Sequence, residues 1–307
     1  MTPAPSIEIN SVSKWYGSVV AVNDVSFNVM PGITGLLGPN GAGKTTILHM
    51  MAGLAKPSDG DIRVLGEPIR GNYKLYSRIG VMSEHEAVYN VFTGRQFVEF
   101  SAKMQGVDDV PAAVDRAIEL VNLADAQHRP LGTYSRGMRQ RMRLAATLVH
   151  DPEVLILDEP LNGTDPRQRL EFHDLMQKLA SEGRTILISS HILEEVETLA
   201  ETILLVVSGK LAAAGDYRAI REKLDDRPFQ LRIVCSDPRK LAAELVKLSA
   251  IDSVAVEDDG SLTVFSRNVA ELQSSIARLA KAADVRLIQL EPLDESLESV
   301  FSYVVSR

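Results

Sequence analysis

The chain has 307 residues, of which 45% are hydrophobic and 24% charged, as in an ordinary globular protein. Lys and Arg number 33 against 41 Asp and Glu, so the formal net charge is -8, and no long basic run is present. We therefore expect no nucleic acid partner, because proteins that bind nucleic acid usually carry a basic surface. The length allows one large domain and a smaller one.

No segment of the sequence is apolar enough to suggest a membrane span. The purest aliphatic run, Ile203 to Val207, is far shorter than the roughly 20 residues that a spanning helix needs. Residues 1–6 lack the basic and apolar regions of a signal peptide. We expect a chain that neither crosses a membrane nor is secreted.

The first two thirds of the chain alternate short apolar strands with amphipathic helices, which predicts an α/β fold with a central parallel sheet. The helices between about residues 90 and 150 form a separable insertion. The expected strands are Ile7–Val12, Val19–Val29, Ile33–Leu37, Ile62–Leu65, Ile79–Met82, Val154–Leu157 and Thr185–Ser189. The expected helices are Lys44–Leu54, Phe92–Gln105, Val110–Ala124, Met138–Val149, Pro166–Ala180 and Leu193–Leu199.

The rhythm changes at about Phe229, where the expected order becomes β-α-β-β-α-β, the pattern of a ferredoxin-like α+β domain. A closing amphipathic helix, Leu297–Val304, should pack against the protein because its apolar residues recur at helical spacing. We therefore expect a first domain over residues 1–222 and an accessory domain over residues 228–307.

A phosphate-binding loop stands between an expected strand and an expected helix. Its sequence fits G-x-x-x-x-G-K-[ST], and its residues are Gly38, Pro39, Asn40, Gly41, Ala42, Gly43, Lys44 and Thr45, followed by Thr46. Backbone N–H groups of such a loop converge on the β-phosphate, the lysine neutralises the outer phosphates, and the threonine hydroxyl binds Mg²⁺. The sequence thus predicts a site for ATP with Mg²⁺ rather than a decorative glycine turn.

Two acids, Asp158 and Glu159, end the buried strand Val154–Leu157. At the carboxyl edge of a parallel sheet, Asp158 would hold Mg²⁺ through water and Glu159 would act as the general base on the attacking water. A strand that simply ends in solvated acids is the alternative, and the phosphate loop argues against it.

Three further residues, Ser135, Gly137 and His191, each allow two interpretations from the sequence. Ser135 and Gly137 precede an expected helix, so they could bind an anion at its N-terminus or simply cap the helix. His191 follows the strand Thr185–Ser189, so it could reach a γ-phosphate or serve a structural role.

Taken together, the segments from Ile7 to about Ile220 resemble the ATP-binding cassette (ABC) ATPases in order and spacing. The segment Tyr134-Ser135-Arg136-Gly137-Met138 is similar to the signature of that family, in which these residues bind the γ-phosphate of ATP held by the opposite copy. The resemblance implies a head-to-tail dimer of two copies, or of the chain with a homologous ATPase subunit, with two composite sites. It also implies nucleotide contacts for Ser135, Gly137 and Met138.

The resemblance assigns roles to three other residues. His191 matches the switch histidine, Asp165 looks like the residue of the loop through which the copies sense each other, and Tyr16 resembles the aromatic that stacks on adenine. Three departures stand beside these matches. Glu84 replaces a glutamine yet could still bind Mg²⁺, Arg136 and Met138 replace a glycine and a glutamine of the commonest signature, and Thr164 replaces a leucine.

The C-terminal part is similar to the extension of drug and antibiotic exporter ATPases. The resemblance therefore implies an ATP-hydrolysing subunit of an exporter, at the cytoplasmic face of a membrane through a separate transmembrane permease. A small domain that only stabilises the dimer is the alternative for this extension. The alternative for the whole chain is a soluble ABC ATPase acting on ribosomes or nucleic acid. Only about 90 residues separate Lys44 from Ser135, too few for the long inserted arms of such proteins.

Overall fold

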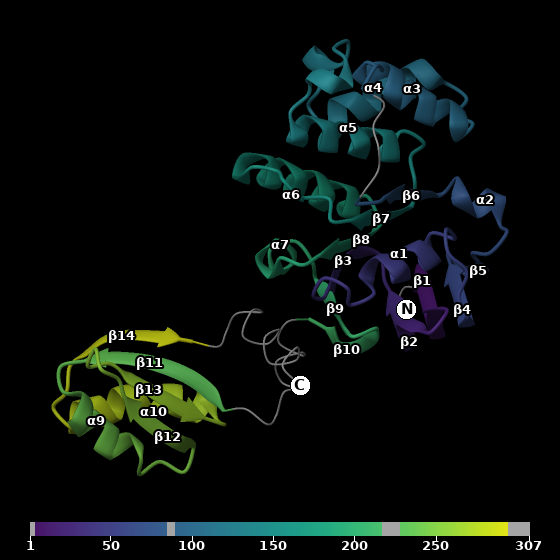
Figure 1. The fold of residues 1–307 in the computed structure, drawn as a ribbon. Helices are drawn as coiled ribbons and strands as arrows, with labels where there is room; N and C mark the ends of the chain where they lie inside the picture. Colours follow the sequence, from purple (N-terminus) through teal and green to yellow (C-terminus); the bar gives the residue numbers. More distant parts are fainter. Residues whose placement is uncertain (1–3, 85–89, 217–227, 294–307) are drawn as a thin grey trace. The chain divides into compact units, whose positions relative to one another are not determined.

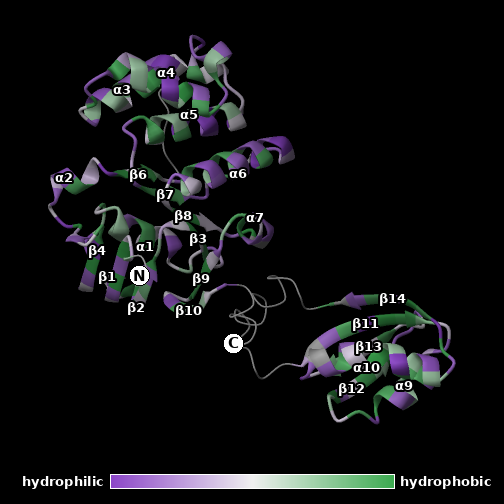
Figure 2. Cartoon of the chain, turned by 180° about the vertical axis from the view of Figure 1, so that it is seen from behind, coloured by the Kyte–Doolittle hydropathy of each residue, from purple (hydrophilic) through white to green (hydrophobic). Residues whose placement is uncertain are grey.

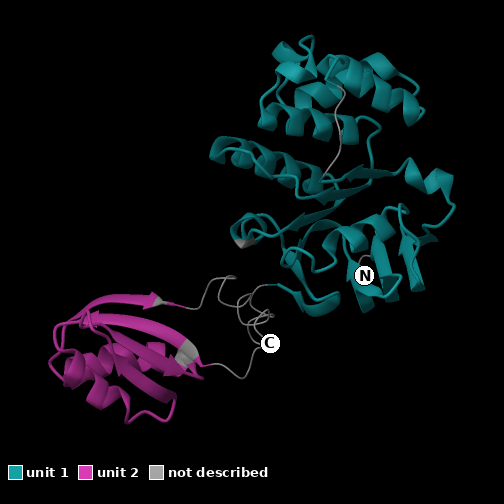
Figure 3. Cartoon of the chain, in the orientation of Figure 1, with its two compact units in different colours: residues 1–216 teal, residues 217–307 magenta. Residues whose placement is uncertain are grey.

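The computed structural model describes residues 4–84, 90–216 and 228–293. The chain divides into two compact units, residues 1–216 and residues 217–307 (Figure 3). Each unit has its own hydrophobic core. The two units are therefore described one at a time.

A six-stranded sheet forms the centre of the first unit, with strand order β10-β9-β3-β8-β7-β6. All neighbouring strands are parallel except β10, which is antiparallel to β9. The strands are β3 (Gly32–Leu37), β6 (Ile79–Met82), β7 (Val154–Asp158), β8 (Thr185–Ser190), β9 (Thr202–Val207) and β10 (Lys210–Gly215).

A second sheet in this unit, of order β2-β1-β4-β5, is antiparallel. Its strands are β1 (Ile7–Tyr16), β2 (Val19–Val29), β4 (Asp59–Val64) and β5 (Glu67–Pro68). The helices of the unit are α1 (Lys44–Met51), α2 (Tyr73–Tyr76), α3 (Gly94–Met104), α4 (Val110–Leu120), α5 (Arg136–Leu148), α6 (Pro166–Ser181) and α7 (Leu193–Glu197). Short 3-10 turns lie at Ala124–Ala126 and Leu131–Thr133.

The central sheet is buried on both faces, which explains its continuous aliphatic sequences. Successive side chains of β7 point to opposite faces. Leu155 and Leu157 join the core beneath α5 and α6, whereas Val154 and Ile156 join the core around α1 and the antiparallel sheet. In Figure 2 the central strands are mostly hydrophobic, while α6 alternates hydrophilic and hydrophobic residues.

Helices α3, α4 and α5 group together on one side of the first unit (Figure 1). Local sequence signals set where they begin. Thr93 and Gln96 form a capping box at α3, and Asp109 accepts a hydrogen bond from the backbone of Ala112 at α4. Buried residues of all three helices join one core, which includes Phe97, Val114 and Met142.

The second unit has the expected β-α-β-β-α-β order, with a sheet of strand order β12-β13-β11-β14. Its elements are β11 (Phe229–Cys235), α9 (Pro238–Leu245), β12 (Ile251–Val256), β13 (Leu262–Ser266), α10 (Val269–Ala282) and β14 (Leu287–Pro292). The fold class predicted from the sequence is confirmed for both units. The expected closing helix Leu297–Val304 lies outside the described residues.

Some elements differ from the sequence prediction. Helix α5 begins at Arg136, two residues before the expected start, because Ser135 already caps it. The run Ile203–Val207 is most of β9, and the β9–β10 hairpin was not expected. Within the described part of the chain, no helix is both long enough and apolar enough to span a membrane.

Candidate active site

The register of the central sheet brings four chain segments to one edge. Leu37 pairs with Ser190, Asp158 with Ser189, and Met82 with Leu157. The segments that follow β3, β7, β8 and β6 therefore leave the sheet side by side, at the carboxyl edge where ligands bind in such sheets. They carry the phosphate loop, Glu159, His191 and Glu84.

The phosphate loop has a backbone that requires glycine at specific positions. Gly43 has a φ of 103°, and a Cβ atom there would lie 2.5 Å from the carbonyl oxygen of Ala21. A Cβ atom on Gly38 would lie 2.2 Å from the carbonyl oxygen of Val206. The glycines thus allow the close approach of backbones that a phosphate cradle needs.

Helix α1 begins at Lys44, so its N-terminus points its free N–H groups toward the loop. The Lys44 side chain is buried, and its ammonium donates to the carbonyl oxygens of Gly38 at 2.7 Å and Pro39 at 3.4 Å. Asn40 and Gly41 are exposed, Ala42 is buried and Thr46 is half-buried within α1. A cation and a helix N-terminus thus share one small region, as an anionic phosphate would require.

Thr45 and Asp158 are in direct contact across the sheet edge. The Thr45 hydroxyl donates to Oδ2 of Asp158 at 2.8 Å, although 113 positions separate the two residues. A hydroxyl and a carboxylate are hard oxygen donors, which suit Mg²⁺ because this ion uses one or two carboxylates together with water and phosphate oxygens. Among the described residues no cluster of three or more His, Cys, Asp or Glu could hold a metal alone. The donors present therefore fit a metal that arrives with a nucleotide.

Ser189 holds both acids of the site, and the sequence prediction did not assign it a role. Its hydroxyl donates to Oδ1 of Asp158 and accepts a hydrogen bond from the backbone N–H of Glu159 at 3.0 Å. Glu159 has a φ of 49°, a left-handed conformation that costs a non-glycine residue about 1–3 kcal/mol. Ser189 is fully buried and stabilises this conformation. The pairing of β7 with β8 brings these residues together. A local sequence motif does not reveal this pairing.

Glu159 is a buried carboxyl group with two cationic or protonatable neighbours. Its Oε2 lies 2.9 Å from Nδ1 of His191, and its Oε1 lies 3.7 Å from the Lys44 ammonium. Burial raises the pKa of the Glu159 carboxyl above its ordinary value, while the hydrogen bond with His191 and the positive charges nearby oppose that rise. His191 thereby fixes the carboxylate, and the raised pKa makes it a better proton acceptor than a solvated glutamate.

Ser135 and Asp165 cap helices, whereas Gly137 and Met138 lie in the first turn of α5. The Ser135 hydroxyl accepts a hydrogen bond from the backbone N–H of Met138, and Asp165 accepts one from Gln168 at the start of α6. A Cβ atom on Gly137 would lie 1.8 Å from Oε1 of Gln168. In the described structure, no recorded hydrogen bond or ion pair joins Ser135 to the phosphate loop or to Glu159.

Tyr16 and Glu84 are two further residues that the sequence predicts for the site. Tyr16 ends β1 with a half-exposed ring, and the Lys14 ammonium lies 4.7 Å from the centre of that ring. An exposed aromatic ring is a surface on which a planar base could stack. Glu84 follows β6 by two residues, and its carbonyl oxygen accepts a hydrogen bond from Arg143. Arg143 is another residue to which the sequence prediction assigned no role.

Comparisons with known proteins identify the family of the chain. The family model described as "ABC transporter" matches residues 22–162. The bacitracin transport ATP-binding protein BcrA of Enterococcus faecalis is 35% identical over 304 residues, which cover 97% of this chain and 96% of that protein. The daunorubicin/doxorubicin resistance ATP-binding protein DrrA of Streptomyces peucetius is 33% identical over 308 residues, which cover 97% of this chain and 92% of that protein.

A solved structure of an ABC transporter subunit has a similar fold. CbiO1 of Clostridium perfringens, part of the ABC transporter complex CbiONQ, superposes with a TM-score of 0.64 at 26% identity. The match covers 71% of this chain and 92% of the CbiO1 chain. The chain belongs to the ABC transporter family and is an ATP-binding ATPase subunit.

Proposed function

We propose that the chain binds MgATP at the carboxyl edge of its central sheet and hydrolyses it in a site that a second copy completes. The observation that carries this proposal is the buried Glu159, fixed by His191 and Ser189 beside Lys44 and the Thr45–Asp158 pair. A carboxylate held in a strained conformation next to a phosphate cradle is arranged for catalysis more than for stability.

Each of these residues has a part in the reaction. Lys44 neutralises the outer phosphates, and Thr45, Asp158 and Glu84 would hold Mg²⁺, which supplies positive charge to the phosphate oxygens when bound. Glu159 accepts a proton from water as the water oxygen bonds to the γ-phosphorus. The bond between that phosphorus and the bridging oxygen breaks, and ADP and phosphate leave. His191 keeps the Glu159 carboxylate in place during this step.

The second copy is needed because one chain provides one face of the nucleotide. Ser135 caps α5 and Gly137 lies against Gln168, so this end of α5 offers a helix N-terminus for an anion from outside its own site. A head-to-tail pair of copies would place this N-terminus on the γ-phosphate of the partner. Asp165, at the adjacent start of α6, would then lie at the contact between copies.

The relatives support a role in export through a separate membrane permease. BcrA is named for bacitracin transport and DrrA for daunorubicin/doxorubicin resistance, and this chain aligns with nearly the whole length of both. CbiO1 is part of a transporter complex. We therefore place the chain at the cytoplasmic face of a membrane, where closure of its ATP-bound dimer drives the permease to change conformation.

Glu159→Gln removes the proton acceptor and leaves the phosphate loop intact. We expect MgATP binding within about twofold of the unchanged chain and turnover reduced by at least about a hundredfold. Phosphate release and equilibrium binding measure the two quantities. Glu153→Gln is the matched control, because Glu153 precedes the same strand at its other end and pairs with Arg78. Equal turnover in Glu159→Gln and Glu153→Gln would contradict the assignment of the base.

The pH dependence of folding stability, measured without nucleotide, distinguishes Glu159 from Glu153. Burial raises the pKa of Glu159 in the folded state, so the charged form costs stability once the pH rises through that pKa. From about pH 4 to pH 7, Glu159→Gln should therefore gain stability relative to the unchanged chain. Arg78 holds the pKa of the Glu153 carboxyl below its ordinary value, so this carboxylate adds stability as the pH rises toward that ordinary value. Glu153→Gln should therefore lose relative stability as the pH rises to about pH 5, a lower range than that of Glu159→Gln.

Urea unfolding of the full chain and of each variant at several pH values measures these differences. Trends of opposite sign for the two variants support the assigned environments. The same trend in both variants, or a reversed trend in Glu159→Gln, would show that Glu159 is not a desolvated carboxyl.

The native complex tests the membrane assignment. We expect an integral membrane protein to copurify in fixed proportion with the tagged chain from detergent-solubilised membranes. Mass spectrometry of the purified complex identifies it. Copurification with ribosomes in place of a membrane protein would contradict the assignment and favour a soluble ABC ATPase.

A further inference from the structure

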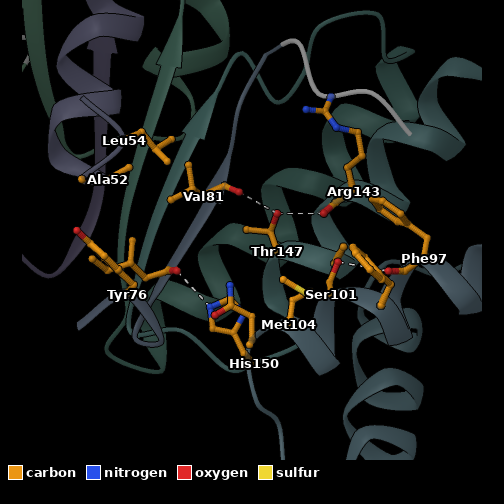
Figure 4. Close-up of a pocket in the computed structure, with 15 residues that line it drawn as sticks. Ala52, Leu54, Tyr76, Val81, Phe97, Ser101, Met104, Arg143, Thr147 and His150 are labelled. Atoms are coloured by element: carbon orange, nitrogen blue, oxygen red, sulfur yellow. Dashed lines mark hydrogen bonds between the residues drawn. The ribbon is translucent and has the colours of Figure 1, made fainter. Parts of the chain in front are cut away.

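Two polar side chains, Thr147 on α5 and His150 just after its end, contact carbonyl groups of β6. Because β6 is the outermost strand of the sheet, every second carbonyl of β6 faces away from β7. Nε2 of His150 lies 3.2 Å from the carbonyl oxygen of Ile79, and the Thr147 hydroxyl donates to that of Val81 at 3.5 Å. These two contacts form one wall of a surface pocket of 660 Å³ (Figure 4).

Arg143 continues this row of contacts beyond the end of the strand. Its guanidinium donates to the carbonyl oxygen of Ser83 and, at 3.4 Å, to that of Glu84. Both residues follow Met82, the last residue of β6, so the sheet no longer fixes their backbone. Figure 4 shows the Arg143 side chain extending from α5 away from His150. Arg143 is buried, which makes its hydrogen bonds stronger than those of an exposed arginine.

Gln140 extends the same network to the segment that carries Glu159. Its Oε1 accepts a hydrogen bond from Arg143 at 2.9 Å, and its Nε2 donates to the carbonyl oxygen of Pro160 at 2.8 Å. Pro160 directly follows Glu159. Two side chains of α5 thus connect the backbone at Glu84 with the backbone next to Glu159.

We propose that Arg143 and Gln140 are positioning residues of the ATPase site, which hold the Glu84 and Glu159 segments in register through α5. This inference rests on the proposed hydrolysis of MgATP. Arginine suits the role because its planar group carries five donors and can bond two carbonyls and an amide together. Since α5 begins at Ser135, the same helix also connects these two segments with the surface offered to a second copy.

The two residues act on different steps. Arg143 orients the backbone of Glu84, the candidate Mg²⁺ ligand, so its loss should weaken the coupling between Mg²⁺ and ATP. Gln140 contacts the segment of Glu159, so its loss should lower turnover and leave the coupling with Mg²⁺ intact. A residue that only supports the fold would instead reduce the amount of active protein. It would change neither the coupling between Mg²⁺ and ATP nor the turnover of each active molecule.

The test compares ATP affinity in Mg²⁺ with ATP affinity in EDTA, measured by equilibrium dialysis in a Glu159→Gln background that does not hydrolyse ATP. The ratio of the two affinities reports how strongly Mg²⁺ and ATP support each other. Arg143→Met keeps the apolar stem and removes the donors. We expect it to lower the ratio by about tenfold, as loss of a residue that orients a metal ligand commonly does.

Three further variants make the result specific. Thr147→Val, which removes a contact to the interior of β6 on the same helix face, should leave the ratio unchanged. Arg143→Lys should restore part of it because lysine keeps a cationic donor. Combined with Glu84→Ala, Arg143→Met should add little, since the two changes act on the same ligand.

Turnover in the chain with Glu159 intact completes the test. We expect Arg143→Met and Gln140→Leu each to lower kcat by about tenfold. The thermal unfolding midpoint of each variant is compared with that of Thr147→Val, which serves as the reference for folding. An unchanged Mg²⁺ ratio in Arg143→Met, at any level of activity, would overturn the inference for Arg143. An unchanged kcat in Gln140→Leu would overturn it for Gln140. If the unchanged chain released no phosphate from MgATP, the proposed hydrolysis itself would fail; that result is separate from these comparisons.

Discussion

The contact between Thr45 and Asp158 is the constraint on which the site depends. It joins the phosphate loop to the end of β7, although the two residues are 113 positions apart in the sequence. Only the parallel order β3-β8-β7 places the two segments at one sheet edge. Ser189, on the strand between them, binds Asp158 and the backbone of Glu159. Packing of the core against both faces of the sheet therefore fixes the register of these three strands, and with it the geometry of the site.

The phosphate loop, the paired acids and the fold class could be predicted because each has a local cause. Glycine spacing defines the loop from Gly38 to Thr45, and four aliphatic residues before Asp158 define a buried strand. Periodicity also predicts the order β-α-β-β-α-β of the second unit, which the structure has. Helix α5 started earlier than its periodicity suggested because the cap at Ser135 sets the boundary.

Ser189, Arg143 and Gln140 could not be predicted because their partners are distant in sequence. Ser189 acts across β7 and β8, and Arg143 reaches Ser83 from a helix some 60 positions later. Nothing in the neighbouring sequence distinguishes Ser189 from any other serine in a strand, or Arg143 and Gln140 from other polar residues on a helix. Strand β9 is not among the predicted elements, although its aliphatic run Ile203–Val207 is typical of a buried strand.

A mixture of two inactive variants tests the central claim, that each nucleotide site is shared by two copies. Lys44→Ala disables the phosphate loop, and Ser135→Arg disables the start of α5. A mixed dimer has one site in which both elements are intact, so an equal mixture should recover up to about a quarter of the ATPase activity of the unchanged chain. A mixture no more active than its two components would contradict the claim.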